Sequence, residues 1–200
     1  MEHAVELPAS LNPPPAKPVL LECYTDPLCP QCRAFEPAWQ RLRAEFGHRF
    51  AWRYRLGGPS LASYPACLAV KCAERQGAPA GELFLHAVAA AAGRPGRNVA
   101  RPEVLAAVAD ELATQVPAVF DAATFQRDLA ANAGATAFRE DVQQAHQHQI
   151  NRLPAIVVLR GSGPGAVLAG GLPYEALLQA LAALAPDVFY VPSLVDGGAG

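Results

Sequence analysis

The chain has 200 residues, of which 52% are hydrophobic and 17% are charged, and its formal net charge at pH 7 is −2. This length and composition are sufficient for one sizeable hydrophobic core, so we expect a single compact unit. The charge balance leaves no cationic surplus to neutralise phosphates, and no block of lysine and arginine occurs along the chain. Nucleic acid is therefore not an expected partner.

Residues 1–18 contain the run Pro13-Pro14-Pro15 and are expected to form an extended arm. The arm lacks the positive leading segment and the continuous apolar stretch of a signal peptide or a membrane anchor. We therefore predict a cytoplasmic protein that does not bind a membrane. The five cysteines are an odd number and too few for a disulfide scaffold. A reducing cytosol favours catalytic or metal-binding roles for closely spaced thiols.

The first elements in chain order predict a β-α-β unit. An apolar run from Val19 to Tyr24, bounded by prolines, indicates a buried strand. A helix is expected from Pro30 to a stop at Gly47, because apolar side chains recur between them at spacings of three and four residues. Alternating apolar and basic residues from Phe50 to Leu56 indicate a second strand, parallel to the first through a right-handed crossover.

The segment 60–149 shows no clear strand pattern. Alanine-rich stretches with helical periodicity predict helices at about residues 64–76, 80–92, 102–114, 121–131 and 135–148. Strands return at 155–159 and 166–169 around a glycine-rich turn at 161–165, and a closing helix is expected at 174–184. The last residues, 195–200, are expected to be frayed. This order predicts an α/β domain with a large all-helical insertion.

The sequence Cys29-Pro30-Gln31-Cys32 lies at the start of the first predicted helix. A helix start presents free backbone N–H groups and a partial positive charge, which stabilise the thiolate form of Cys29. Cys32 lies one turn further into the helix, so Cys29 is the expected nucleophile and Cys32 the thiol that resolves a mixed disulfide. The two-residue spacing lets the oxidised pair close a small ring without moving the backbone.

A zinc site is the main alternative for this pair, with Cys67 and Cys72 as the other two ligands. Structural zinc usually uses two CxxC pairs, whereas these two cysteines are five residues apart on a predicted helix and point about 140° apart. Both are therefore expected to be buried thiols, although a position of Cys67 facing the dithiol stays open. Cys23 is expected to be a small core residue of the first strand.

Other polar residues near the pair have ordinary structural interpretations. A buried carboxylate at Asp26 or Glu22 could take the proton of Cys32, but Asp26 with the proline that follows it is also a common turn opening, and we prefer this interpretation. His146 and His148 lie on opposite sides of a predicted helix and are expected to be exposed to solvent.

The pair Leu153-Pro154 precedes the returning strand, a position at which an X-Pro bond can adopt the cis form. The order of strand, CPxC at a helix start, helical insertion, X-Pro, hairpin and helix, over residues 19–185, resembles the thioredoxin superfamily in its DsbA-like branch. The resemblance implies an α/β, thioredoxin-like fold with a large all-helical insertion. The expected parts are an N-terminal arm (1–18), a thioredoxin-like domain in two segments (19–59 and 150–187), the helical insertion between these segments (60–149) and a C-terminal tail (188–200).

The same resemblance implies roles for individual residues. In that family the cis-proline loop lies against the dithiol, and the backbone before the proline holds an extended substrate chain. Leu153 and Pro154 are therefore expected to bind substrate, together with Pro30 and Gln31 between the two cysteines. Because Gln31 is neutral, the reduction potential is expected to lie between about −270 mV, as in thioredoxin, and about −120 mV, as in DsbA.

Three local sequences, ECYTDPLCPQC, AFEP and YPACLAVKCA, are similar to a bacterial cytosolic DsbA-like group. This group includes FrnE-type oxidoreductases and the adaptors that deliver the Spx regulator to the ClpXP protease. The complete CPQC favours disulfide exchange with protein substrates through Cys29 and Cys32, with a small thiol or the thioredoxin system as reductant. No cofactor or metal is expected, and the protein is expected to be a monomer or a weak dimer. The alternative is a non-enzymatic adaptor of the ClpXP/Spx type that uses the same fold as a binding surface.

Overall fold

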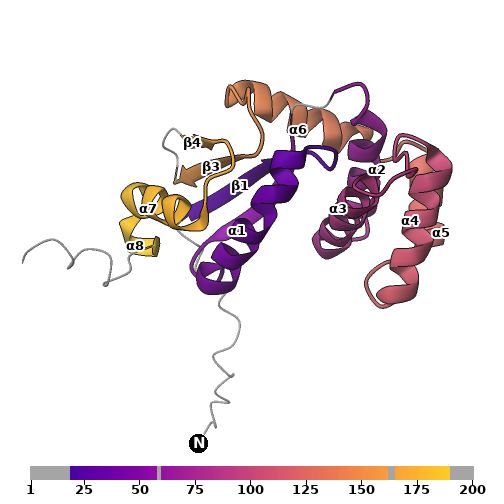
Figure 1. Ribbon diagram of the computed structural model, residues 1–200, viewed down its shortest axis with the longest axis horizontal. Helices are drawn as coiled ribbons and strands as arrows, with labels where there is room; N and C mark the ends of the chain where they lie inside the picture. Colours follow the sequence, from indigo (N-terminus) through magenta and orange to yellow (C-terminus); the bar gives the residue numbers. More distant parts are fainter. Residues whose placement is uncertain (1–18, 58–59, 162–164, 190–200) are drawn as a thin grey trace, which may run out of the picture.

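The computed structural model describes residues 19–57, 60–161 and 165–189. The predicted arm, most of the glycine-rich turn and the predicted frayed end lie outside these residues. The described part contains a four-stranded mixed sheet with helices on both faces, and a group of helices beside it (Figure 1). This arrangement belongs to the predicted α/β class.

The sheet has the strand order β2-β1-β3-β4. β1 (Val19–Thr25) pairs parallel with β2 (Ala51–Leu56), as predicted, and antiparallel with β3 (Ala155–Arg160). β3 in turn pairs antiparallel with β4 (Ala166–Ala169). β1 is an inner strand whose residues are almost all buried, which agrees with its continuous apolar run.

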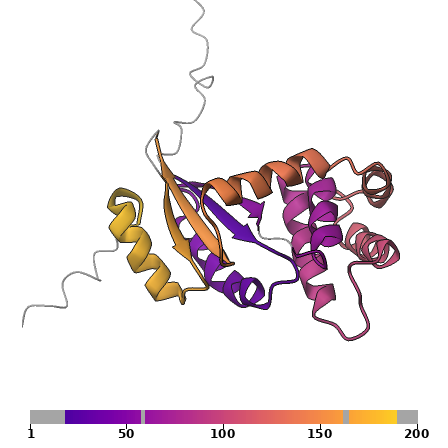
Figure 2. The same ribbon diagram turned by 90° about the horizontal axis from the view of Figure 1, so that it is seen from above.

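Helices cover the two faces of the sheet (Figure 2). α1 (Pro30–Phe46) and α7 (Tyr174–Leu184) pack on one face, and α6 (Ala135–Gln147) packs on the other. Successive side chains of a strand point to opposite faces. Cys23 therefore packs in the α1 layer, as the core residue that its position predicts, and Tyr24 packs toward α6.

A separate layer at the side of the sheet contains four further helices, α2 (Tyr64–Glu74), α3 (Ala78–Ala92), α4 (Pro102–Gln115) and α5 (Ala122–Ala130) (Figure 1). These helices share a hydrophobic core of their own, in which the rings of Phe84, Phe120 and Phe125 have centroid separations of 4.5–5.7 Å. None of the helices in the described ranges is long and apolar enough to cross a membrane.

Buried charges join this helical layer to the sheet. Asp141 of α6 is fully buried, accepts the backbone N–H of Leu56 at 3.0 Å, and pairs with Arg55 at 2.7 Å and Lys71 at 3.0 Å. Arg55 also pairs with the buried Glu22 of β1 at 3.0 Å. One network therefore spans α2, α6, β1 and β2, and the loss of one charge would remove an ion pair from each of its buried partners.

The last helix, α8 (Pro186–Phe189), is not indicated by the sequence patterns. The predicted C-terminal tail at 188–200 is wrong for its first two residues, because Val188 and Phe189 are buried. The ring of Phe189 lies 5.7 Å from that of Phe46 and 5.4 Å from that of Phe50, between centroids. A helix of one turn has no apolar periodicity to recognise, so only the tertiary contact reveals it. The other boundaries of the predicted parts stay predictions.

Candidate active site

Cys29 occupies the N-cap of α1, and Pro30 follows it at the first helical position. The Cys29 Sγ atom accepts the backbone N–H of Cys32 at 3.1 Å, and the Cys29 N–H donates to the Asp26 carbonyl oxygen at 3.0 Å. The sulfur thus has the capping position that a serine or aspartate oxygen usually has at a helix start. Because the Cys29 side chain is partly exposed, a disulfide of another molecule can reach it.

Cys32 lies behind Cys29 and is only 4% exposed. Burial raises the pKa of the Cys32 thiol to about 12, and the hydrogen bond with Cys29 adds to this rise, whereas the Asp26 backbone and the Thr25 side chain oppose it. At neutral pH the Cys32 thiol is therefore protonated. The two cysteines thus differ in access to solvent, although they are separated by a single helical turn.

Gln31 is exposed between the two cysteines, with its Oε1 atom 3.7 Å from the Cys29 Sγ atom. A protonated Cys29 donates to this oxygen. A thiolate would need the amide nitrogen instead, which a rotation of the Gln31 amide group supplies. Because Gln31 carries no charge, this weak hydrogen bond is the main polar effect that it can have on the sulfur.

The loop before β3 lies against the start of α1. The Leu153–Pro154 peptide bond is cis, which is the form predicted from the sequence. A Cβ atom placed on Gly171 would lie 3.9 Å from Pro154 Cγ and 3.8 Å from the Gln31 carbonyl oxygen, so Gly171 lies between the proline and the dithiol helix. Gly170, at φ +92°, donates its N–H to the Pro154 carbonyl oxygen at 2.7 Å. Glycine suits this left-handed backbone region.

Two cavities border the dithiol. The first has a volume of about 380 Å³ and is lined by Cys29, Gln31 and the segment 150–153, which includes Leu153. The second has a volume of about 350 Å³, lies between α1 and α3, and is lined in part by Cys32. Asp26 borders both cavities. The structure thus brings three of the six predicted site residues into one cavity and a fourth into its neighbour.

The two prolines of the predicted site lie beside these cavities. Pro30 is exposed at the first turn of α1, next to Cys29. Pro154 is buried and, with Phe35 of α1, lines a smaller space. Both prolines therefore shape the backbone around the dithiol, because proline fixes φ and has no N–H to donate.

Other polar residues near the dithiol have structural partners. Asp26 is buried, and its Oδ1 atom accepts the N–H of Leu28 at 2.7 Å, which is the predicted turn role. His146 is exposed as predicted, but the prediction of exposure is wrong for His148. The His148 Nδ1 atom lies 3.0 Å from the Tyr24 hydroxyl oxygen, and the two residues are 124 positions apart. A contact between such distant positions leaves no local sequence pattern.

The remaining cysteines, Cys23, Cys67 and Cys72, are 2%, 1% and 0% exposed. Burial raises the pKa of all three thiols, and the charge of Asp26 raises that of Cys67 further. The Cys72 Sγ atom instead lies 3.6 Å from the Asp128 carbonyl oxygen, so the two cysteines of α2 face different surroundings. Across the described ranges, no group of three or more histidine, cysteine, aspartate or glutamate side chains is arranged to hold a metal ion.

Comparison with known proteins identifies the family. Residues 57–179, more than half of the chain, match the family described as thioredoxin. The ClpXP adapter protein SpxH of Halalkalibacterium halodurans is 26% identical in an alignment of 211 positions, gaps included, that covers 82% of this chain and 67% of that protein.

Solved structures share the fold at low sequence identity. A protein of Nitrosomonas europaea assigned as a protein disulfide isomerase has a TM-score of 0.72 at 19% identity, covering 84% of this chain and 98% of its own. DsbA2 of Pseudomonas aeruginosa has a TM-score of 0.60 at 21% identity, covering 86% of this chain and 91% of its own. The predicted thioredoxin-like fold is thus confirmed. The chain is similar in sequence to the SpxH adapter, shares its fold with DsbA2, and belongs to the thioredoxin family.

Proposed function

We propose that the protein is a cytoplasmic thiol-disulfide oxidoreductase that exchanges disulfides with protein substrates through Cys29 and Cys32. The proposal rests on the difference in exposure between the two cysteines and on the raised pKa of Cys32. Cys29 is partly exposed at the N-cap of α1, and Cys32 is buried with its pKa raised to about 12. An attacking thiol must reach its partner, whereas a resolving thiol acts only on the mixed disulfide in front of it.

The reduction of a substrate disulfide has two steps. The thiolate sulfur of Cys29 attacks one substrate sulfur, a mixed disulfide forms, and the second substrate sulfur leaves and takes up a proton. Cys32 then loses its proton and attacks the Cys29 sulfur, which releases the first substrate sulfur as a thiol. The substrate gains two electrons and two protons, and the protein becomes the Cys29–Cys32 disulfide. The reverse sequence oxidises a substrate dithiol.

The substrate chain is assigned to the cavity beside Cys29. Leu153 and Gln31 line this cavity, so an extended chain there can contact the Leu153 backbone while its sulfur meets Cys29. Pro154 and Pro30 hold the two flanking backbones in place. Electrons move between sulfur atoms, so no cofactor is needed, and a small thiol or the thioredoxin system returns the protein to the dithiol. We assign the active form to a monomer or a weak dimer.

A trapping experiment tests this function. The Cys32→Ser variant, incubated with insulin as a disulfide-containing protein, should accumulate a covalent complex, because the mixed disulfide cannot be resolved. Cys29→Ser should form none, and Cys72→Ser, which removes a buried thiol outside the site, should turn over like the wild type. The function is refuted if Cys29→Ser traps insulin as well as Cys32→Ser, or if neither variant traps it. Non-reducing electrophoresis with mass spectrometry provides the measurement.

An adaptor is the second candidate, because the SpxH relatives bear the name of ClpXP adapters. A hollow of about 590 Å³ in the predicted insertion, lined partly by Tyr64 and Leu68, offers a binding surface for it. Tyr64 is 48% exposed and the nearby Leu61 is 98% exposed. The variant with both Cys29→Ser and Cys32→Ser separates the candidates. An adaptor retains its partner without the dithiol, whereas an oxidoreductase loses its covalent complex.

A further inference from the structure

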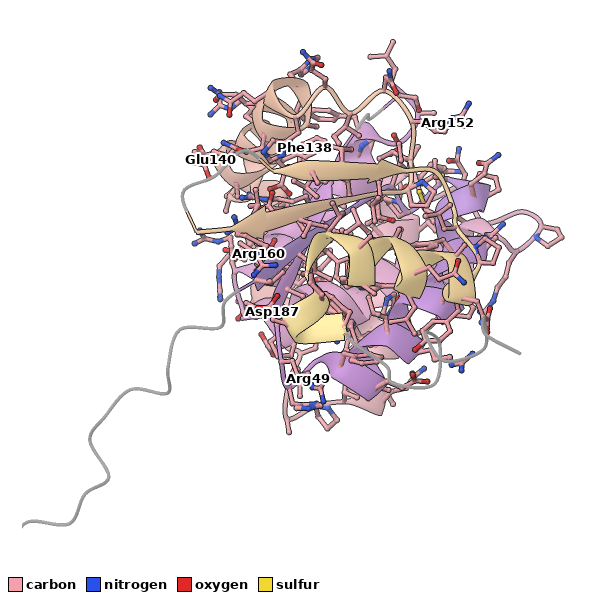
Figure 3. The ribbon with its side chains drawn as sticks, turned by 90° about the vertical axis from the view of Figure 1, so that its left-hand side faces the viewer. Arg49, Phe138, Glu140, Arg152, Arg160 and Asp187 are labelled. Atoms are coloured by element: carbon pink, nitrogen blue, oxygen red, sulfur yellow. The ribbon has the colours of Figure 1, made fainter. Side chains whose placement is uncertain are left out.

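Two exposed arginines border the cavities beside the dithiol. Arg152 lines the cavity that contains Cys29 and projects from the loop between α6 and β3 (Figure 3). Arg33 follows Cys32 on α1 and lines the cavity between α1 and α3. Each cavity therefore has one exposed guanidinium group at its edge.

Neither of these two guanidinium groups forms an ion pair with any of residues 19–57, 60–161 or 165–189. The Arg33 Nη1 atom donates to the Ala89 carbonyl oxygen at 3.3 Å, a contact that leaves its charge without a carboxylate partner. Within the part of the chain that the structure describes, no carboxylate lies within ion-pair distance of Arg33 or Arg152. By contrast, Arg43 and Arg55 each pair with a carboxylate.

The other ionisable side chains that line the two cavities already have partners. Asp26 is buried and accepts the N–H of Leu28. Glu36 accepts the hydroxyl of Tyr54 at 2.6 Å and lies 3.0 Å from His86 Nε2. The exposed charged groups that line the two cavities are therefore the two guanidinium groups, whose local field at the cavity edges is positive, although the whole chain has a net charge of −2. Such a local field acts over about 10 Å at an ionic strength of about 0.1 M.

We propose that Arg33 and Arg152 select protein substrates whose reactive cysteine is flanked by aspartate or glutamate. This inference rests on the proposed function, because it names the substrate class of the same dithiol. The cavity of about 380 Å³ is lined by both Cys29 and Arg152, and a cube of that volume has an edge of about 7 Å, which an extended chain crosses in about two residues. An acidic side chain about two residues from the substrate cysteine can therefore reach Arg152 while the sulfur atom is at Cys29. Acidic residues that extend into the second cavity meet Arg33.

Peptide disulfides with different flanking charges provide the test. Two glutamates, two lysines or two glutamines flank one cysteine, which is linked through its disulfide to a fluorescent reporter thiol. Each rate with the full-length protein is divided by the rate of the same peptide with dithiothreitol, which corrects for the effect of the charges on the peptide's own sulfur. The corrected rate with glutamate should exceed that with lysine about threefold to tenfold near 0.05 M salt. The ratio should approach one near about 0.5 M salt.

Charge variants assign the preference to the two arginines. Arg152→Glu should bring the glutamate-to-lysine ratio below one, and Arg33→Gln should lower it. Arg127→Glu is the matched control, since Arg127 is an exposed arginine on α5, away from α1 (Figure 1), and should leave the ratio unchanged. The ratio is taken within one variant, so a change in folded fraction cancels.

The outcomes separate this inference from the proposed function. Equal corrected rates for all peptides in the wild type, or an equal loss of preference in Arg127→Glu, overturn the role of Arg33 and Arg152 while disulfide exchange stands. If the wild type exchanges no peptide, the proposed function itself fails. A preference for glutamate that salt and Arg152→Glu both remove supports the inference.

Discussion

One of the five cysteines of the folded protein should react with iodoacetamide. Four of them, Cys23, Cys32, Cys67 and Cys72, are at most 4% exposed, whereas Cys29 is partly exposed. We therefore expect one carbamidomethyl group per folded chain, on Cys29. All five cysteines should be labelled after unfolding in guanidinium chloride.

The rate expected for Cys32 follows from its environment. With a pKa of about 12, about one Cys32 thiol in 10⁵ is ionised at pH 7, against about 3% for an ordinary cysteine with a pKa of about 8.5. The ionised fraction is thus lower by about 3,000-fold. The more basic thiolate regains about 40-fold in nucleophilicity at a Brønsted slope of about 0.45. The raised pKa alone therefore slows the reaction of Cys32 with iodoacetamide about 100-fold relative to an ordinary cysteine, and the limited access to its buried sulfur slows the reaction further.

The measurement is a time course of labelling at pH 7, followed by proteolysis and mass spectrometry of each cysteine peptide. Cys29→Ser should abolish labelling of the folded protein, and Cys72→Ser should leave it at one group per chain. If Cys32 were labelled at a rate within tenfold of the rate of Cys29, or if two groups were added per folded chain, the inferred difference in access between the two thiols would be wrong.

Three further predictions concern the buried charges and the redox couple. Asp141→Asn should lower the free energy of unfolding by about 2 to 3 kcal/mol, because it removes the buried carboxylate that Arg55 and Lys71 share and leaves each cation with one carboxylate partner. The exposed control Asp187→Asn should cost under about 1 kcal/mol in urea unfolding. Burial would raise the pKa of the Glu22 carboxyl group, but hydrogen bonds and charges from Arg53 and Arg55 lower this pKa overall. The ionised carboxylate therefore contributes fully to the free energy of unfolding above its unfolded pKa of 4.5. This contribution is lost as the pH falls through the lower pKa of the folded state. The urea midpoint should therefore drop as pH falls from about 5 to about 3, and a constant midpoint contradicts this. Equilibration of Cys29 and Cys32 with glutathione buffers should give a potential above about −270 mV, and a value below about −300 mV would mean a resting disulfide.

Local patterns predict much of the fold because each element buries one face. The predicted helix at 102–114 is observed as Pro102–Gln115, and the predicted strand at 166–169 is observed with the same bounds. Apolar periodicity reports such a face directly from the sequence. The start of α1 was also predictable, since a proline at the first helical position and a stop at Gly47 mark its two ends.

Contacts between distant elements could not be predicted in the same way. Glu22, Arg55 and Asp141 come from three elements, and their pairing depends on how α6 crosses the sheet. Helical periodicity gives the angle between Cys67 and Cys72, but it does not say which of them faces Asp26 and the dithiol. The exposed guanidinium groups near Cys29 have no local signal either, because most arginines of any sequence are exposed.

Polar contacts between α1 and α3 restrain the width of the cavity beside Cys32. Arg43 of α1 pairs with Glu82 of α3 at 2.5 Å with both side chains largely buried, and Arg33 donates to the Ala89 carbonyl oxygen near the end of α3. Widening the cavity beside Cys32 would separate these partners and leave largely buried charges without compensation, a cost of several kcal/mol. The part of a substrate that extends past Cys32 therefore meets a cavity whose width these contacts restrain. In our proposal, selection in this second cavity comes from the match between the charges of the substrate and the exposed Arg33.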